Sequence, residues 1–174
     1  ADAALSGMTL PFSEGAPQFD FSVGIQSLSI SGHKLIGAPV PCGVVLALKQ
    51  NVDRIARSIE YVGTLDTTIT GSRNAITPLM LWHAIRSRGI EGFRKTVNRC
   101  LSRAEYAVNR LNEIGVKAWR NPHAMTVVFP KPAPLILEKW QLAVQGDFAH
   151  IMVMPHVTHE KIDQLAADII SNPS

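Results

Sequence analysis

Residues 27–34 read SLSISGHK and place a lysine directly after a strand-like pattern. Apolar and polar side chains alternate over residues 27–31, as they do in a strand with one buried face. The loop GAPVPCG follows at residues 37–43, and residues 43–48 form a second apolar run that predicts a buried strand. Two strands joined by this loop place Lys34 just past a strand end, where sites in α/β proteins are commonly found.

Helical patterns dominate the middle of the chain. Thr77, followed by proline, predicts a helix start, because threonine caps helix N-termini and proline fits the first helical position. Residues 79–85 are apolar nearly all round, which predicts a buried helix ending near Gly89. Residues 91–114 carry one continuous apolar stripe and predict a longer helix that ends at Gly115.

The remainder of the chain predicts a small α+β unit. Its expected elements are strands at residues 116–119, 125–129 and 150–154, a short helix at 135–142, and a last helix opened by Thr158. The predicted fold class is therefore α/β, in two parts. Residues 1–112 form the end of a larger domain with the long connecting helix, and residues 113–174 form the small domain.

Composition argues against several classes of protein. Hydrophobic residues make up 46% and charged residues 18% of the chain, which favours a packed core over disorder. The net charge of +3 comes from scattered basic residues, so we expect no nucleic-acid partner. We also expect no membrane span, since no run approaches the ~20 apolar residues that one needs, and no signal peptide. The isolated Cys42 and Cys100 favour reduced thiols in a cytoplasmic protein.

Three histidines near the end of the chain could suggest a metal site. His150, His156 and His159 fall on a predicted strand end, a loop and a helix start, without a neighbouring pair of carboxylates. Structural zinc and other transition-metal sites need a closer set of ligands. We therefore expect no metal, although His150 could still approach an active site.

Lys34 gains its interest from its surroundings. A lysine between a strand and an apolar loop is partly desolvated, and desolvation favours the neutral amine that forms imines with carbonyl groups. Ser31 and His33 could donate hydrogen bonds to a phosphate. The segment DAALSG, at residues 2–7, precedes this stretch.

Four motifs together resemble those of the group II pyridoxal-phosphate-dependent amino-acid decarboxylases. They are DAALSG (2–7), SGHK (31–34), PCG (41–43) and TGSRN (70–74), in the same order and at similar spacing. Within this group the chain is most similar to the bacterial histidine decarboxylases, over essentially all its length, and it also resembles the plant serine decarboxylases. The resemblance implies the C-terminal part of a type I, aspartate aminotransferase-like fold: the end of the large domain and the small C-terminal domain.

The resemblance also implies a role for each site residue. Lys34 would hold pyridoxal 5′-phosphate as a Schiff base, and Asp2 would pair with the pyridine nitrogen and keep it protonated. Ala4 would pack on the face of the ring. Ser31 and His33 would contact the phosphate.

Two further assignments concern loops after residue 60. Gly71 and Ser72 would contact the phosphate of the neighbouring subunit, in a homodimer whose active sites are shared. Tyr61 is the candidate proton donor on a mobile loop. A tyrosine beside apolar residues is also commonly packed, and both interpretations of Tyr61 stay open.

The implied reaction is decarboxylation of an L-amino acid: loss of CO2, protonation at Cα and release of the amine. Histidine, which gives histamine, is the first expectation, and serine or another L-amino acid is the alternative. A different class is a cofactor-free remnant that serves only as a dimerisation or regulatory partner. The family fold is longer than this chain, so we expect an upstream half, possibly a separate chain, to complete the site and this chain alone to be inactive.

Overall fold

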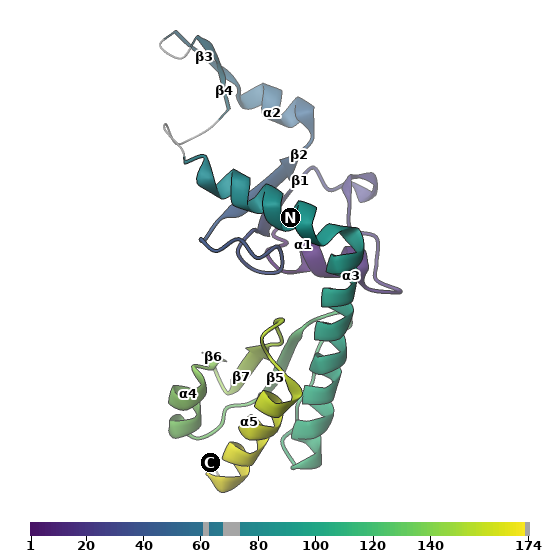
Figure 1. Cartoon of the computed structure of the whole chain (residues 1–174), viewed down its shortest axis with the longest axis vertical. Coiled ribbons are helices and arrows are strands. Elements are labelled where there is room, and N and C mark those ends of the chain that lie inside the picture. Colours follow the sequence, from purple (N-terminus) through teal and green to yellow (C-terminus); the bar gives the residue numbers. More distant parts are fainter. Residues whose placement is uncertain (61–62, 68–73, 173–174) are drawn as a thin grey trace. The chain divides into compact units, whose positions relative to one another are not determined.

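The structure is a computed structural model that describes residues 1–60, 63–67 and 74–172 (Figure 1). The first part of the protein is built around the backbone pairing of one short strand, described below. The chain divides into two units. Unit 1 comprises residues 1–11 and 17–90, and unit 2 comprises residues 12–16 and 91–174. Residues 12–16 enter unit 2 briefly, and the chain finally passes from unit 1 to unit 2 within a helix, α3 (Ile76–Glu113). The predicted boundary after residue 112 refers to the domains of a longer protein and stays a prediction.

The strand β1 (Ser27–Ser31) forms the centre of unit 1. It pairs antiparallel with β2 (Gly43–Ala47) along one edge. The start of the chain lies along the other edge, where Asp2 bridges Ser29 in the parallel sense. The N–H of Ala3 donates to the Ser29 carbonyl at 2.9 Å. Both edges of β1 are therefore occupied, as the backbone groups of an inner strand require.

A small hydrophobic cluster covers one face of β1. It consists of the buried Leu28, Ile30 and Ile36, with Met8, Phe21, Ile25, Val44, Leu81 and Ala84 packed against it. The burial pattern along β1 alternates, so the predicted strand and its buried face are confirmed. Short helical segments at α1 (Ser6–Thr9), η1 (Leu10–Phe12) and η2 (Phe21–Val23) precede the strand.

Three short elements that the sequence did not predict follow β2. They are α2 (Lys49–Ile55) and the antiparallel pair β3 (Arg57–Ile59) and β4 (Thr64–Asp66). Each is too short to carry a clear period, and residues of α2 are half-buried or exposed. Periodicity detects an element only when several turns or alternations of it face a core.

Two predictions of burial in unit 1 are wrong. Residues 43–47 form the predicted strand, yet Val45 is 71% exposed. The predicted helix before Gly89 also forms, yet Leu79 and Trp82 are 61% and 59% exposed. An apolar pattern predicts that a surface will be buried, but it does not show which residues will bury it. Among the described residues, none covers the exposed side chains of Val45, Leu79 and Trp82.

Helix α3 is interrupted at the glycine that the sequence singled out. Gly89 has φ 60° and ψ −179°, a conformation that is essentially restricted to glycine. The predicted helix end there and the second helix from residue 91 are thus confirmed. At the start of α3, Asn74 Oδ1 accepts a hydrogen bond from the Thr77 N–H at 2.8 Å, so Asn74 caps this end rather than Thr77. Gly115, with φ 83°, follows the last turn as predicted.

Unit 2 is a three-stranded antiparallel sheet with helices on one face. The strands are β5 (Thr126–Pro130), β6 (Ala143–Gln145) and β7 (Phe148–Met152), in the order β5-β7-β6. Helices α4 (Pro134–Trp140) and α5 (His159–Ser171) join the second stretch of α3 over the sheet (Figure 1). Their shared core contains Ala104, Ala107, Leu111, Ala118, Val127, Phe129, Ile136, Ala149, Val153, Ile162 and Leu165.

The predicted elements of unit 2 are mostly confirmed. Strands β5 and β7 and helices α4 and α5 form within a few residues of their expected bounds, with Thr158 as the N-cap of α5. The strand expected at residues 116–119 is wrong, because only Trp119 forms a single bridge, with Val128. Among the described residues, none of the helices combines the length and apolar character needed to span a bilayer.

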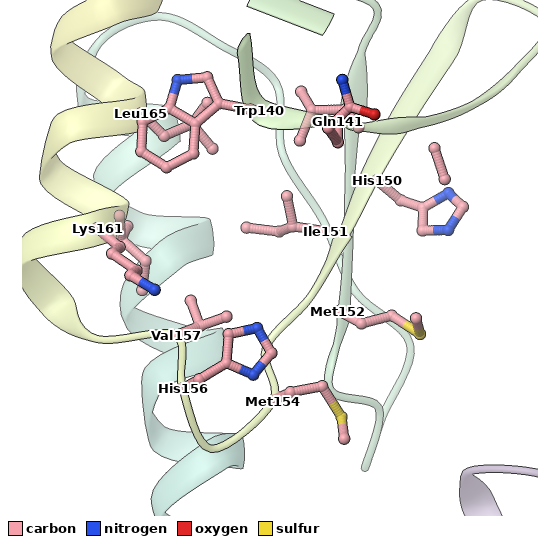
Figure 2. A pocket seen from close by; sticks show the side chains of 13 residues that line it. Trp140, Gln141, His150, Ile151, Met152, Met154, His156, Val157, Lys161 and Leu165 are labelled. Atoms are coloured by element: carbon pink, nitrogen blue, oxygen red, sulfur yellow. The ribbon is translucent and has the colours of Figure 1, made fainter. Parts of the chain in front are cut away.

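A pocket of about 420 Å³ opens in unit 2 between the end of α4, β7 and the start of α5. Figure 2 shows its walls, which are mostly apolar, with the polar side chains of Gln141, His150, His156 and Lys161 among them. This pocket lies wholly within unit 2.

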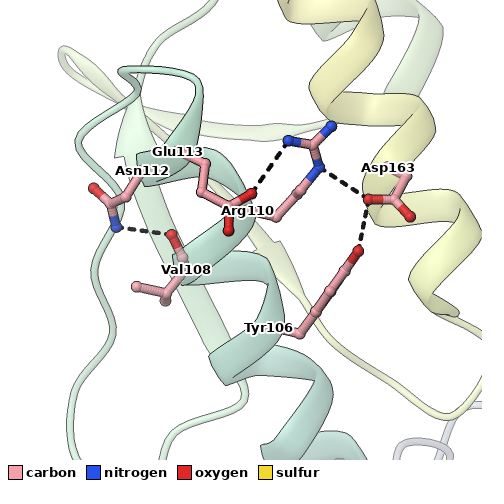
Figure 3. A network of polar contacts seen from close by, with 6 residues as sticks. All are labelled: Tyr106, Val108, Arg110, Asn112, Glu113 and Asp163. Carbon is pink, nitrogen blue, oxygen red and sulfur yellow. Dashed lines mark hydrogen bonds and ion pairs between the residues drawn. The ribbon is translucent and has the colours of Figure 1, made fainter.

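A polar network ties α3 to α5 (Figure 3). The Tyr106 hydroxyl donates to Asp163 Oδ1 at 2.7 Å, and Arg110 Nε donates to the same oxygen at 3.0 Å. Arg110 also pairs with Glu113 at 3.3 Å. The Tyr106 hydrogen bond first, and the Arg110 guanidinium second, lower the pKa of Asp163 below its ordinary value.

The network predicts a loss of stability in acid. A carboxyl whose pKa is depressed in the folded state stabilises the fold above its unfolded pKa, and this contribution disappears as the pH falls through the folded pKa. We therefore expect Asp163→Asn to lower the unfolding midpoint at neutral pH and to flatten its fall towards acid, as measured by thermal unfolding across pH. Asp147→Asn is the control, because the Asp147 side chain makes no hydrogen bond or ion pair with a described residue. Equal pH profiles for the two variants would contradict the prediction.

Candidate active site

Lys34 lies in the turn that immediately follows β1, and its side chain is half-buried. The Gly32 N–H donates to the Cys42 carbonyl at 2.8 Å, and the Ala38 N–H donates to the Gly32 carbonyl at 2.9 Å. Both hydrogen bonds join residues of the loop between β1 and β2, so they fix the path of its backbone. The predicted position of Lys34, just beyond a strand end, is confirmed.

His33 is fixed by the opposite side of the same loop. Its Nδ1 lies 3.2 Å from the Cys42 N–H nitrogen and 3.1 Å from the Cys42 carbonyl oxygen. The backbone at the PCG motif therefore orients this imidazole. The ring is exposed, and its other nitrogen, Nε2, makes no hydrogen bond with a described residue.

The start of the chain brings two more candidates beside β1. The Ser31 N–H donates to the Ala4 carbonyl at 3.1 Å, and Asp2 bridges Ser29. The Asp2 side chain accepts a hydrogen bond from the Ala4 N–H at 3.1 Å through Oδ1. Backbone pairing thus holds Asp2 and Ala4 beside β1, whose last residue is Ser31 and which leads into Lys34.

The donor set at this end of β1 fits pyridoxal 5′-phosphate. Lys34 offers an amine for the aldehyde, and Asp2 offers a carboxylate for a protonated ring nitrogen. Ser31 and His33 offer a hydroxyl and an imidazole, both suited to phosphate oxygens. Ala4 has a small side chain, as a residue packed against a flat ring would need. The chemistry of these groups therefore matches the four parts of one cofactor.

Three of the predicted site residues lie outside the described residues. They are Tyr61, the candidate proton donor, and Gly71 and Ser72, the candidates for contact with a neighbouring subunit. Their roles stay predictions.

The three histidines that the sequence singled out, His150, His156 and His159, lie in two settings. His150 and His156 line the pocket of Figure 2, and the His159 ring packs on Tyr106 with 4.3 Å between ring centroids. The described part of the chain holds no group of three His, Cys, Asp or Glu side chains arranged to bind a metal ion.

Sequence reasoning missed one residue at the lysine loop. Arg88, near the end of the first stretch of α3, donates hydrogen bonds to the carbonyl oxygens of Leu35 and Ile36. An arginine in the last turn of a helix has many ordinary uses, such as interaction with the helix dipole. No local sequence signal links it to a loop 52 positions earlier.

A lysine beside a carboxylate, a hydroxyl and an imidazole is typical of enzymes that bind an aldehyde cofactor. Comparisons with known proteins identify the family to which the chain belongs. The conserved domain of the pyridoxal-dependent decarboxylases matches residues 1–131. The histidine decarboxylase of Morganella morganii is 50% identical over 173 residues, which cover 99% of this chain and 46% of that protein. The histidine decarboxylase of Vibrio anguillarum is 47% identical over 171 residues, covering 98% of this chain and 44% of that protein.

A solved structure gives the same result for the fold. L-methionine decarboxylase from Streptomyces sp. 590, in its internal aldimine form, matches with a TM-score of 0.84 and 30% sequence identity. The match covers 99% of this chain and 41% of that chain. The fold class predicted from the sequence is confirmed.

The chain belongs to the pyridoxal-dependent decarboxylase family. The resemblance found in its four motifs is thereby confirmed. The chain spans about half the length of the curated relatives that it matches.

The close packing of the DAALSG segment against β1 can be tested by a substitution at Gly7. A Cβ on Gly7 would lie 2.7 Å from Ile30 Cγ1 and 3.2 Å from Ala3 Cβ, inside the cluster that backs β1. We expect Gly7→Ala to destabilise the protein by about 1–3 kcal/mol, the usual range for overpacking a core, as measured by urea unfolding.

Gly43→Ala is the matched control. Its Cβ would approach nothing closer than the Ile30 carbonyl oxygen, at 4.0 Å. If the two variants unfolded at the same urea concentration, α1 would not be in tight contact with β1 and the prediction would be wrong.

Proposed function

We propose that this chain carries the lysine-bearing part of a decarboxylase that uses pyridoxal 5′-phosphate to convert L-histidine into histamine and CO2. The observation that carries the proposal is the double pairing of β1, which sets Asp2 and Ala4 beside the strand that ends at Ser31 and leads into Lys34. The identity of about 50% to curated histidine decarboxylases supports histidine as the substrate.

Each of the described residues would have a separate task. Lys34 would hold the cofactor covalently through Nζ, and Asp2 would accept a hydrogen bond from the ring nitrogen and keep its proton in place. Ser31 and His33 would bind the phosphate, and Ala4 would lie against the ring. When bound, the cofactor supplies a sink for the electrons that remain when CO2 departs. Holding the substrate carboxylate in the correct orientation selects the bond that breaks.

The same proposal includes a partner for this chain. An upstream half, on the same polypeptide or on a separate chain, would complete the cofactor site, and two such proteins would form a homodimer. Leu79, Trp82 and Ile85 support this, because they are exposed apolar side chains at i, i+3 and i+6 on one face of α3. An exposed apolar patch commonly marks an interface. Gly71 and Ser72 would reach the neighbouring subunit's phosphate, and Tyr61 would return a proton to Cα.

The alternatives are less well supported. The relatives compared above are histidine decarboxylases, which favours histidine over serine as the substrate. A cofactor-free remnant is not favoured either, because Lys34 and the groups that suit each part of the cofactor are all present. We propose a cytoplasmic location, in agreement with the free thiols of Cys42 and Cys100.

Replacement of the lysine tests the proposal directly. In the protein completed by its upstream half, we expect Lys34→Ala to abolish the visible absorbance of the lysine-bound cofactor. Histamine formation should fall by more than about 10²-fold, since misplacing a reacting group alone can cost that much. Absorbance spectra after removal of free cofactor and chromatographic analysis of the amine product are the measurements.

Lys49→Ala serves as the control, because Lys49 is an exposed lysine of unit 1 that pairs only with Asp53 among the described residues. It should retain both signals. Absence of the lysine-dependent absorbance from the completed wild-type protein would overturn the enzyme assignment. Formation of ethanolamine from serine, with no histamine from histidine, would overturn the substrate.

A further inference from the structure

We propose that Arg88 is a positioning residue for Lys34, and this inference rests on the proposed function. Arg88 Nη1 donates to the Leu35 carbonyl at 2.9 Å and to the Ile36 carbonyl at 2.8 Å. These are the first two carbonyl groups after the lysine. Hydrogen bonds from a charged donor are roughly twice as strong as neutral ones, so the guanidinium holds the backbone just beyond Lys34.

The loop is shaped to receive this guanidinium. Gly37 has φ +82°, and a Cβ at this position would lie 2.8 Å from Arg88 Nη2 and 3.0 Å from Nη1. The chain therefore turns directly over the guanidinium, which only glycine permits at this φ and this approach. The contact is between backbone and arginine, so it fixes the path of the chain rather than a single side chain.

Burial also restrains this segment. Leu35, Ile36 and Ala38 are 2%, 4% and 5% exposed, and Ile36 belongs to the cluster behind β1. Strand pairing anchors the residues before it. Lys34 is thus a half-buried side chain between two fixed points, and Nζ makes no hydrogen bond or ion pair with a described residue.

The proposed reaction requires the amine of Lys34 to be held close to one position. The lysine side chain is long and flexible, so the region that Nζ samples is set by the position of its Cα. A fixed Cα raises the effective concentration of the amine at one place, and small displacements of a reacting group reduce the rate strongly. Arg88 would act on the reaction only through the lysine backbone, without touching substrate or cofactor.

The test compares Arg88→Met with Arg86→Met in the protein completed by its upstream half. Arg86 lies on the same stretch of α3 and makes no hydrogen bond or ion pair with a described residue. We expect Arg88→Met to lower kcat by about 10- to 10²-fold with a smaller change in the KM for histidine, because the reacting group is misplaced. The pH midpoint of the visible absorbance of the lysine-bound cofactor should also shift. Arg86→Met should leave kcat and this midpoint unchanged.

Arg88→Lys keeps the charge and one donor group but loses the planar fork. It should give values between those of wild type and Arg88→Met, and it decides the question if Arg88→Met fails to fold. A purely structural role predicts a lower thermal midpoint with wild-type kcat and absorbance midpoint in the folded variants. That result would overturn the inference while leaving the proposed function intact. Absence of the lysine-dependent absorbance in wild type would overturn both.

Discussion

The site depends on the way in which the backbone of β1 is paired along both of its edges. One edge bonds to β2, and Ser29 on the other edge bonds to the first residues of the chain. Because these bonds join backbone groups, they place Asp2 and Ser31 without using their side chains. The carboxylate and the hydroxyl therefore keep most of their hydrogen-bonding capacity for a ligand. In the proposed cofactor site, backbone pairing would hold these residues in place and their side chains would contact the cofactor.

Local periodicity explains what could be predicted from the sequence. The alternation over residues 27–31 gave the strand and its buried face, and the stripe over residues 91–114 gave the second stretch of α3. The motifs gave the identity of Lys34 as a candidate. What lay beyond prediction is non-local: the pairing of the chain start with β1, and the contact of Arg88 with a loop more than 50 positions away. Every residue has a backbone carbonyl, so the sequence does not show which residue will accept such a hydrogen bond.

The two units differ in the size of their hydrophobic cores. The core cluster of unit 2 has eleven buried residues, nine of them on three helices and two strands and two, Ala118 and Val153, in the segments between them. The cluster behind β1 has three. Burial of apolar surface is the main favourable contribution to folding, so unit 1 has far less of it within the described residues. Its exposed apolar helix and strand faces match this deficit, and the proposed upstream half would cover them. The wrong predictions of burial and the small core thus have one physical origin.

The loop between β1 and β2 combines rigidity and freedom in adjacent residues. An amine that must bond to a cofactor and be released again in every turnover needs a mobile side chain, yet its rate depends on where that side chain begins. Residues on both sides of Lys34 are tied, by strand pairing before it and by the Arg88 contacts after it. The backbone on both sides of Lys34 loses its conformational entropy when the protein folds. This cost is therefore not repeated in each reaction cycle. The turn can therefore present a flexible lysine from a fixed Cα, which neither an exposed loop nor a fully buried strand could do.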